Sequence, residues 1–331
     1  MRPSFSGSNE KQKSCGEVRI NAAHQKTQIK VLGVSALTCH NAANTTELHR
    51  SMSPELSQKL AAAVDNMPAF PKSVQKILDL TRNVNSTPKE LVEVIDKDPV
   101  VTVKILKVVN SAYYGLPKQI TSIGHAVVYL GFNTIKNLAL SIAAIGMLPK
   151  GNASGFDVDQ YLLHSLATAG IAKSLAGKVQ DADPMDCFIA GLLHDFGKVV
   201  FAQFMPEEFK AALTLSQSQG MSLHTALQNT MGVDHVVVGA MLVEKWRFAP
   251  NLIETIRHQH IANLKDTDMI ACVFGANQIS KHLKFGYGGN PCIDAFPEMV
   301  QKRLGGSMEE VIMSMGDLVP LFEEAKIFSR L

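Results

Sequence analysis

The chain has 331 residues, 46% of them hydrophobic, which is enough to bury the core of one large domain or two modest ones. Its 32 basic and 30 acidic residues leave a formal net charge of +2, and the basic residues are scattered. The charge therefore predicts no nucleic-acid or membrane-surface partner. Five cysteines without a C-x-x-C pair predict neither a zinc finger nor a disulfide framework, and they fit a reducing, cytoplasmic compartment.

The first part of the chain lacks the pattern of a folded segment. Residues 1–52 are rich in Ser, Asn, Thr, Gln and Lys and show no sustained hydrophobic period, so we expect a disordered leader or an overlong start with Met52 as the initiator. The strongly apolar stretch at residues 138–148 is too short to cross a bilayer, which needs about 20 residues. We therefore expect no membrane span.

Helix-start signals follow one another from Ser53 onward. Ser53-Pro54, Asp98-Pro99 and Asp183-Pro184 each place a capping side chain before a proline at the first helical position. Thr87 and Glu90 form the pattern of a capping box. Apolar residues recur at spacings of three and four, and sustained alternation of the strand type is absent.

These patterns predict an all-α protein with about a dozen helices. The loop "GNASG", at residues 151–155, is the best internal boundary. It divides an N-terminal helical bundle at 53–150 from a second bundle at 156–287. A C-terminal helical tail at 288–331 contains one more amphipathic stretch, residues 308–322.

The segment "AGLLHDFGKVVFAQF" places His194 and Asp195 side by side in an apolar run. A buried imidazole and carboxylate are costly unless something pairs with them. The run from Pro184 predicts one central helix, on which consecutive residues point about 100° apart. His194 and Asp195 then face one point only if other helices close in, and Gly191 and Gly197 permit such an approach.

Other apolar segments carry histidines that could join this pair. His164, His235 and His258 each lie in a different predicted helix. A single histidine of this kind is most often a core residue with one satisfied hydrogen bond. Several imidazoles with one carboxylate instead suit a divalent transition metal such as iron, manganese, zinc or nickel. The residues by themselves leave both interpretations open.

The order of these residues resembles the HD superfamily of metal-dependent phosphohydrolases, through "GLLHDFGK" with His164 before it. A more specific resemblance, covering about residues 60–285, is to the HDOD domain, the HD-related output domain. Four segments carry it in order: "MPAFPKSVQKILDLTRN", "KDPVVTVKILKVVNSAYYG", "ITSIGHAVVYLGFNTIKNLALS" and "VVVGAMLVEKWRFAPNLIETIRHQH". The resemblance implies an HD-like bundle packed against an N-terminal bundle, with His235 and His258 in the place of additional metal ligands.

Two positions depart from the enzyme pattern that this resemblance implies. Asn277 stands in "CVFGANQIS" where the distal aspartate belongs, and a neutral amide is a weaker ligand than a carboxylate. Gln259 follows His258 where a second histidine belongs, while His260 on a continuing helix points to a different side. We therefore expect a vestigial or weak metal site.

The resemblance implies a bacterial signalling module that is not catalytic and acts through a signalling protein partner. The alternative is an active phosphohydrolase, with Asp195 and Lys198 as the candidate catalytic residues. Lys198 could hold a phosphate, or it could extend its ammonium group to solvent from the end of the helix. We expect Asn110 to satisfy a helix end and Trp246 to anchor the core.

Overall fold

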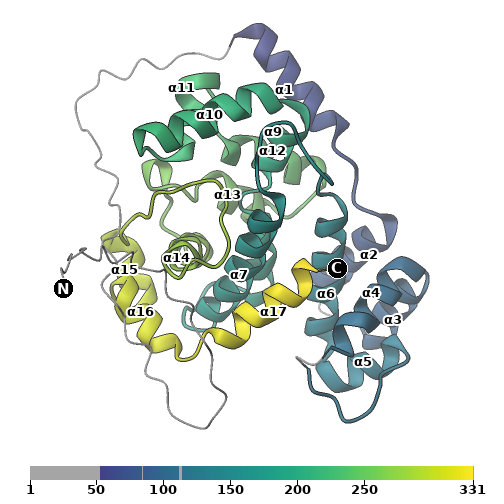
Figure 1. Ribbon diagram of the computed structural model, residues 1–331. Helices are drawn as coiled ribbons and strands as arrows, with labels where there is room; N and C mark the ends of the chain where they lie inside the picture. The colour runs from purple at the N-terminus through teal and green to yellow at the C-terminus, as the bar shows by residue number, and fades with distance from the viewer. Residues whose placement is uncertain (1–52, 84, 112–113, 331) are drawn as a thin grey trace, which may run out of the picture. The chain divides into compact units, whose positions relative to one another are not determined.

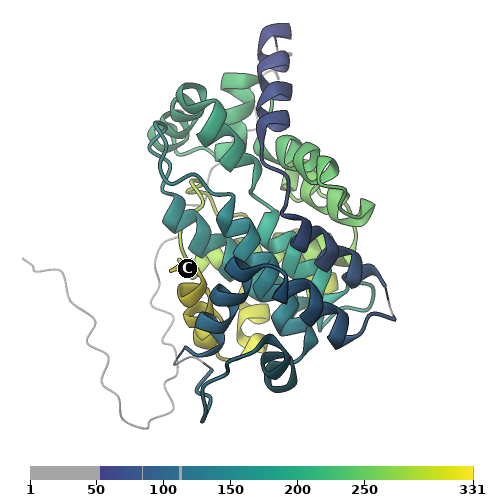
Figure 2. The same ribbon diagram turned by 90° about the vertical axis from the view of Figure 1, so that its right-hand side faces the viewer.

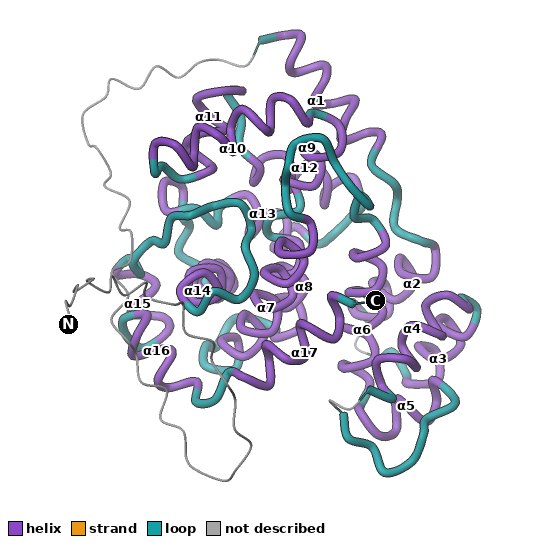
Figure 3. The backbone as a smooth tube through the Cα atoms, viewed as in Figure 1, coloured by secondary structure: helices purple, strands orange, loops and turns teal. Residues whose placement is uncertain are grey.

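The computed structural model describes residues 53–83, 85–111 and 114–330, and over these it contains helices and loops but no strand (Figures 1 and 3). The predicted all-α class is therefore confirmed. The expected disorder of residues 1–52 lies outside the described residues. The helices are α1 Pro54–Asn66, α2 Lys72–Arg82, α3 Pro88–Asp96, α4 Pro99–Val109, α5 Ile123–Leu130, α6 Phe132–Gly146, α7 Val158–Ala176, α8 Pro184–Leu193, α9 Gly197–Phe204, α10 Pro206–Gln219, α11 Leu223–Met231, α12 His235–Lys245, α13 Pro250–Arg257, the 3-10 helix η1 Ile261–Asn263, α14 Asp268–His282, α15 Glu298–Leu304, α16 Met308–Met315 and α17 Val319–Ser329.

The predicted helix starts are present. Ser53 caps α1, Asp98 caps α4 and Asp183 caps α8, each by accepting hydrogen bonds from backbone N–H groups of the first turn. Thr87 and Glu90 form the full capping box of α3. These local bonds satisfy N–H groups that have no partner within the helix, which explains why the sequence located the starts correctly.

Over the described residues the helices outnumber the dozen expected, in part because two apolar segments are interrupted. The stretch predicted at residues 308–322 is two helices, since α16 ends at Gly316, whose φ of 76° is the left-handed conformation that favours glycine. The run from Pro184 to Phe204 is likewise divided into α8 and α9. Its mean hydropathy of 1.3 and its length could suit a membrane span, but 83% of it is buried within the protein. It is therefore a core segment of this fold.

Three helices form the centre of the fold. Helices α8 and α14 both pack along α7, and α17 covers α7 from another side (Figure 1). Most residues of α7, α8 and α14 are buried. Helices α2 to α6 pack mainly on one another, as the purple to teal ribbons of Figure 2 show, and α6 joins them to α8. The side chains that α7, α8 and α14 direct at one another therefore lie in a closed interior.

The segment around α1 belongs to the second bundle by its contacts. Helix α1 packs on α9 and α12. Lys245 donates to the carbonyl oxygens of Val64 and Asp65 at 2.9 and 2.6 Å, near the end of α1. The indole of Trp246 donates to Pro68 O at 3.1 Å, and Trp246 is 5% exposed. Trp246 is thus a core anchor, as expected.

Glycines allow the central helices to approach as closely as the sequence suggested. A Cβ at Gly191 would lie 2.8 Å from Ala169 Cα of α7. A Cβ at Gly197 would lie 2.0 Å from His235 O and 2.8 Å from Gly239 N of α12. Because the opposing atoms are backbone, no side chain can move to make room. These contacts bring α7 and α12 against the turn that carries His194 and Asp195.

Candidate functional site

His194 and Asp195 lie in a tight turn between two helices, not within one helix as predicted. Helix α8 ends at Leu193 and α9 begins at Gly197. Across the turn, Phe196 N donates to Leu193 O at 3.0 Å and Lys198 N donates to Asp195 O at 2.9 Å, bonds of the tighter 3-10 type. Because a 3-10 turn has three residues per turn, the two side chains do not keep the α-helical spacing of about 100°.

Asp195 is the centre of a buried cluster. Its Oδ2 lies 3.2 Å from His194 Nε2 and 4.0 Å from His164 Nε2, and its Oδ1 lies 3.0 Å from His235 Nε2. All four side chains are 2% exposed or less. The structure thus brings His164, His194, Asp195 and His235 together from α7, the turn and α12.

Lys198 supplies the cation nearest to this carboxylate. Its Nζ lies 2.5 Å from Asp195 Oδ2 and donates to Gly288 O at 2.7 Å. Lys198 is 1% exposed, so of the two alternatives that the sequence left open, the one in which its ammonium group reaches solvent is excluded. The residue lies one turn after Asp195, near the start of α9, which packs on α12.

The loop between α14 and α15 closes over the cluster. A Cβ at Gly288 would lie 2.9 Å from His164 Cδ2 and 3.1 Å from Asp195 Oδ2. Tyr287 N donates to Gln160 O of α7 at 3.0 Å, which holds the loop in place. Backbone therefore covers the buried pair at a position where a side chain does not fit.

The imidazoles present lone pairs toward Asp195. His194 Nδ1 lies 2.8 Å from Gly191 O, and because a carbonyl only accepts, Nδ1 carries the proton of that bond. Ser280 Oγ donates to Phe285 O and lies 3.1 Å from His164 Nδ1, so it accepts from that nitrogen. In the neutral rings, Nε2 is then an acceptor that faces a carboxylate oxygen, and a cation between the two atoms relieves the repulsion.

Several of these atoms have no hydrogen-bond partner among the described residues. They are His164 Nε2, His194 Nε2, both ring nitrogens of His235 and Asn277 Oδ1. Although His235 Nε2 lies 3.0 Å from Asp195 Oδ1, the geometry does not suit a hydrogen bond. Buried polar atoms without a partner are uncommon in native proteins and commonly mark a site for water or an ion.

Burial and neighbouring groups keep the carboxylate of Asp195 charged and the imidazoles of His164 and His235 neutral. Burial by itself would raise the pKa of Asp195, but its interactions with His194, Lys198 and His235 outweigh burial and hold this pKa well below 3.8. Burial lowers the pKa of His235 to about 3 and holds the pKa of His164 well below 6.5. Neutral imidazole is the form that binds metal ions.

The donor set of His164, His194 and Asp195 fits one divalent transition ion. Distances of 3.2 and 4.0 Å from Asp195 Oδ2 to the two Nε2 atoms suit ligands that share an ion at about 2.0–2.2 Å from each. Asn277 is 4% exposed and lies one turn before Ser280 on α14, with its Oδ1 unpaired. As a ligand, an amide would contribute no charge, and Lys198 already pairs with Asp195, so both features would weaken metal affinity.

His258 does not join this cluster, contrary to the expectation. Helix α13 ends at Arg257, and His258 Nε2 lies 3.5 Å from Glu254 Oε2 with its side chain 20% exposed. Gln259 instead points inward and donates to His194 O at 2.6 Å. His260 also turns inward, with its ring centroid 4.8 Å from that of His235. His258 and His260 thus point to different sides, as expected, and His260 lies beside Asp234, outside the Asp195 cluster.

Other residues of the site carried only faint sequence signals. Ser280 orients His164, Gln259 holds the turn, and Gly288 leaves room for the pair. Ser280 lies three residues after Asn277 on the same helix, and this spacing could have indicated a shared face. Gly288 belongs to "GYGGN", whose glycines predict a tight backbone but not what it covers.

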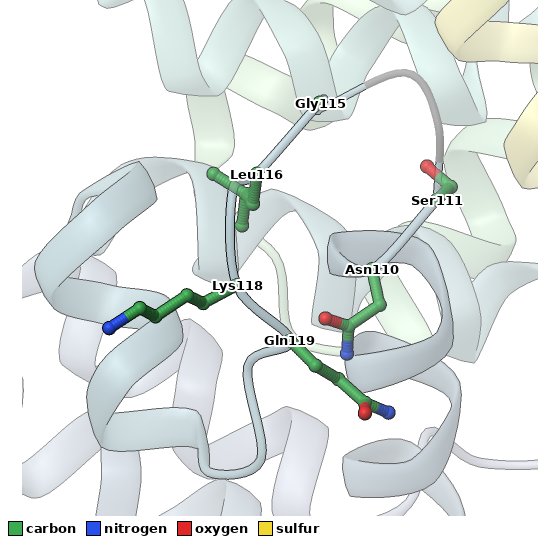
Figure 4. Close-up of a pocket in the computed structure, with 6 residues that line it drawn as sticks. All are labelled: Asn110, Ser111, Gly115, Leu116, Lys118 and Gln119. Atoms are coloured by element: carbon green, nitrogen blue, oxygen red, sulfur yellow. The ribbon is translucent and has the colours of Figure 1, made fainter.

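A separate pocket of about 310 Å³ lies among the N-terminal helices, at the end of α4 (Figure 4). Asn110 donates from Nδ2 to Leu106 O and Ile120 O, both at 2.8 Å, and its Oδ1 accepts from Ile120 N at 2.7 Å. The amide is fully occupied in joining the helix end to the following loop. This confirms the structural role expected for Asn110.

Comparison with known proteins identifies the fold. Residues 67–262 match the HDOD domain. A solved HDOD protein of unknown function from Geobacter sulfurreducens has a TM-score of 0.71 at 24% identity, over 82% of this chain and 96% of that one. A candidate signal-transduction protein from Marinobacter aquaeolei has a TM-score of 0.68 at 22% identity, over 83% and 66%. A candidate phosphohydrolase from Shewanella amazonensis has a TM-score of 0.63 at 23% identity, over 82% and 98%.

A relative of uncharacterised function from Treponema pallidum is 26% identical over 212 residues. That match covers 64% of this chain but only 41% of the relative. The chain thus spans less than half of the length of this relative.

Proposed function

The chain belongs to the HDOD domain family, and on that premise we propose that it is a cytoplasmic, non-catalytic module of bacterial signal transduction that acts through contacts with a protein partner. The observation that carries the proposal is the contact of Lys198 Nζ with Asp195 Oδ2 beneath the backbone of Gly288. The carboxylate that an HD hydrolase uses to hold its metal is here paired with an internal cation. The pair then serves mainly to hold α7, α9 and the loop after α14 together.

The described surface also offers a candidate region for partner contacts. Val100 and Val103 of α4 are 66% and 65% exposed, and Val128 and Tyr129 of α5 are 80% and 57% exposed. The two helices pack on each other. Large exposed apolar side chains on neighbouring elements are typical of interaction sites.

Metal content and turnover of the purified protein test the non-catalytic part of this proposal. We expect the wild-type protein to retain substoichiometric metal and to release no p-nitrophenol from bis(p-nitrophenyl) phosphate with added Mn²⁺, Fe²⁺ or Ni²⁺. Asn277→Asp restores the missing carboxylate and serves as the matched comparison. Stoichiometric metal and turnover in the wild type, abolished by His194→Ala, would overturn the proposal.

Site-specific photo-crosslinking in cells tests the partner contact. A crosslinking amino acid at Val128 is expected to capture a defined protein, whereas the same residue at Met313, which is 72% exposed on α16, is not. Equal patterns at the two positions would count against a partner surface on α4 and α5.

A metal-dependent phosphohydrolase is the second candidate, favoured by the unpaired Nε2 atoms of His164 and His194. These nitrogens and Asp195 would hold the ion, and a bound divalent ion supplies a Lewis acid that activates water toward a phosphoester. Lys198 would then have to leave Asp195 to hold a phosphate oxygen. The same turnover assay separates this candidate from the first.

A further inference from the structure

A second group of potential metal ligands lies next to His194 and Asp195, the HD pair, but shares no residue with it. His224 comes from α11, Asp234 is the N-terminal cap of α12, and His260 follows α13. One ligand atom from each lies within 4.8 Å of the others. Asp234 Oδ2 is 3.2 Å from His224 Nδ1 and 3.5 Å from His260 Nδ1.

These distances suit ligands of a common ion. Nitrogen and carboxylate ligands lie about 2.0–2.2 Å from Zn²⁺, so neighbouring ligands of a tetrahedral site are about 3.4 Å apart. Both distances from Asp234 Oδ2 match that value closely. Two imidazoles and one carboxylate are also a ligand set that leaves coordination positions open for water.

The neighbouring groups orient the three ligands toward one point. Asp234 Oδ1 accepts from Val236 N at 3.0 Å and Val237 N at 3.2 Å, which leaves Oδ2 directed at the histidines. A hydrogen bond from His224 to Asp234 can account for that pair without an ion. It does not account for His260 Nδ1, which is buried, faces Asp234 Oδ2 and has no hydrogen-bond partner among the described residues.

Access from solvent distinguishes this group from the HD pair. The side chains of His224, His260 and Asp234 are 24%, 13% and 7% exposed, whereas that of Asp195 is 2% exposed. An ion can therefore enter from solvent and keep water in its remaining positions. We propose that His224, Asp234 and His260 form a binding site for a divalent transition metal ion that joins α11, α12 and the segment after α13. The proposal does not depend on whether the HD pair is catalytic.

Titration of the full-length, chelator-treated protein with Zn²⁺ against a chromophoric competitor tests the site. The measurement is made in a His164→Gln background, which removes a ligand of the HD pair. We expect this variant to bind one Zn²⁺ and to gain thermal stability from it. Adding His224→Gln is expected to weaken Zn²⁺ binding by more than about 100-fold. Loss of a residue that only supports a ligand costs at most about 100-fold, so a larger loss identifies His224 as a direct ligand.

Two further variants make the result independent of folding defects. Asp234→Asn keeps a side chain that caps α12 but removes the anionic ligand, and it should also abolish binding. His258→Gln, two residues from His260 and directed at Glu254, is the matched control and should leave the affinity unchanged. Circular dichroism verifies each fold. Absence of Zn²⁺ binding in the His164→Gln variant, or binding that survives both His224→Gln and Asp234→Asn, would overturn the proposal.

Discussion

Replacing Lys198 by methionine tests what stabilises the buried carboxylate. Methionine keeps an unbranched chain but removes the ammonium group that lies 2.5 Å from Asp195 Oδ2. Both residues are 1% exposed, so water cannot replace the lost cation. Removing one partner of a buried ion pair costs about 3–5 kcal/mol. The imidazole of His194 presents its Nε2 lone pair to the carboxylate at 3.2 Å and so offers no compensation, and we expect a loss of at least about 3 kcal/mol.

Thermal and urea unfolding in the presence of a chelator measure this loss. At about 2 °C per kcal/mol for a chain of this size, the melting temperature should fall by roughly 6 °C. The matched control is Lys326→Met, which breaks a surface pair with Glu323 whose side chains are 36% and 51% exposed and should cost less than about 1 kcal/mol. The double variant Lys198→Met/Asp195→Asn should lose less than the sum of its parts. A loss no greater than that of Lys326→Met would refute the ion-pair argument.

Three further predictions follow from the same site. Asn277→Asp should raise the affinity for a divalent transition metal at least about tenfold, or about 1.4 kcal/mol, which calorimetric titration measures. The same change should lower the stability of the metal-free protein by several kcal/mol, which melting curves recorded with a chelator measure. Because the folded-state pKa values of His164 and His235 lie below 6.5, the unfolded chain binds more protons in acid. The free energy of unfolding should therefore be greatest above pH 6.5 and fall toward pH 3 by up to about 1.4 kcal/mol per pH unit for each histidine. Urea midpoints that do not change between pH 7.5 and pH 5 would contradict this. Gly197→Ala should destabilise the protein by more than about 3 kcal/mol or prevent folding, since its Cβ would meet His235 O at 2.0 Å. The control is Gly220→Ala, where a Cβ meets nothing within 4 Å, so this variant should cost only the strain of its positive φ. Equal expression and equal melting temperatures of the two variants would exclude the close crossing of α9 and α12.

The sequence by itself was sufficient for features that depend on neighbouring residues. The caps at Ser53, Thr87, Asp98 and Asp183 are bonds within four residues, so their residue types already specify them. The helical class followed from apolar spacing for the same reason. The importance of Gly197 could also be anticipated, because a glycine beside a buried pair indicates close backbone approach.

Tertiary structure alone decided how the site is completed. Lys198 could have reached solvent from a free helix, but the crossing of α9 and α12 directs it onto Asp195. The end of α13 at Arg257 directs His258 toward Glu254 and His260 toward Asp234, and a helical period by itself does not specify these contacts. Gly288 contacts His164 and Asp195 from a loop far along the chain, and this contact exists only once the segment after α14 has packed on α7. Local bonds thus determined where the helices begin, while the packing of backbone on backbone determined which side chains meet.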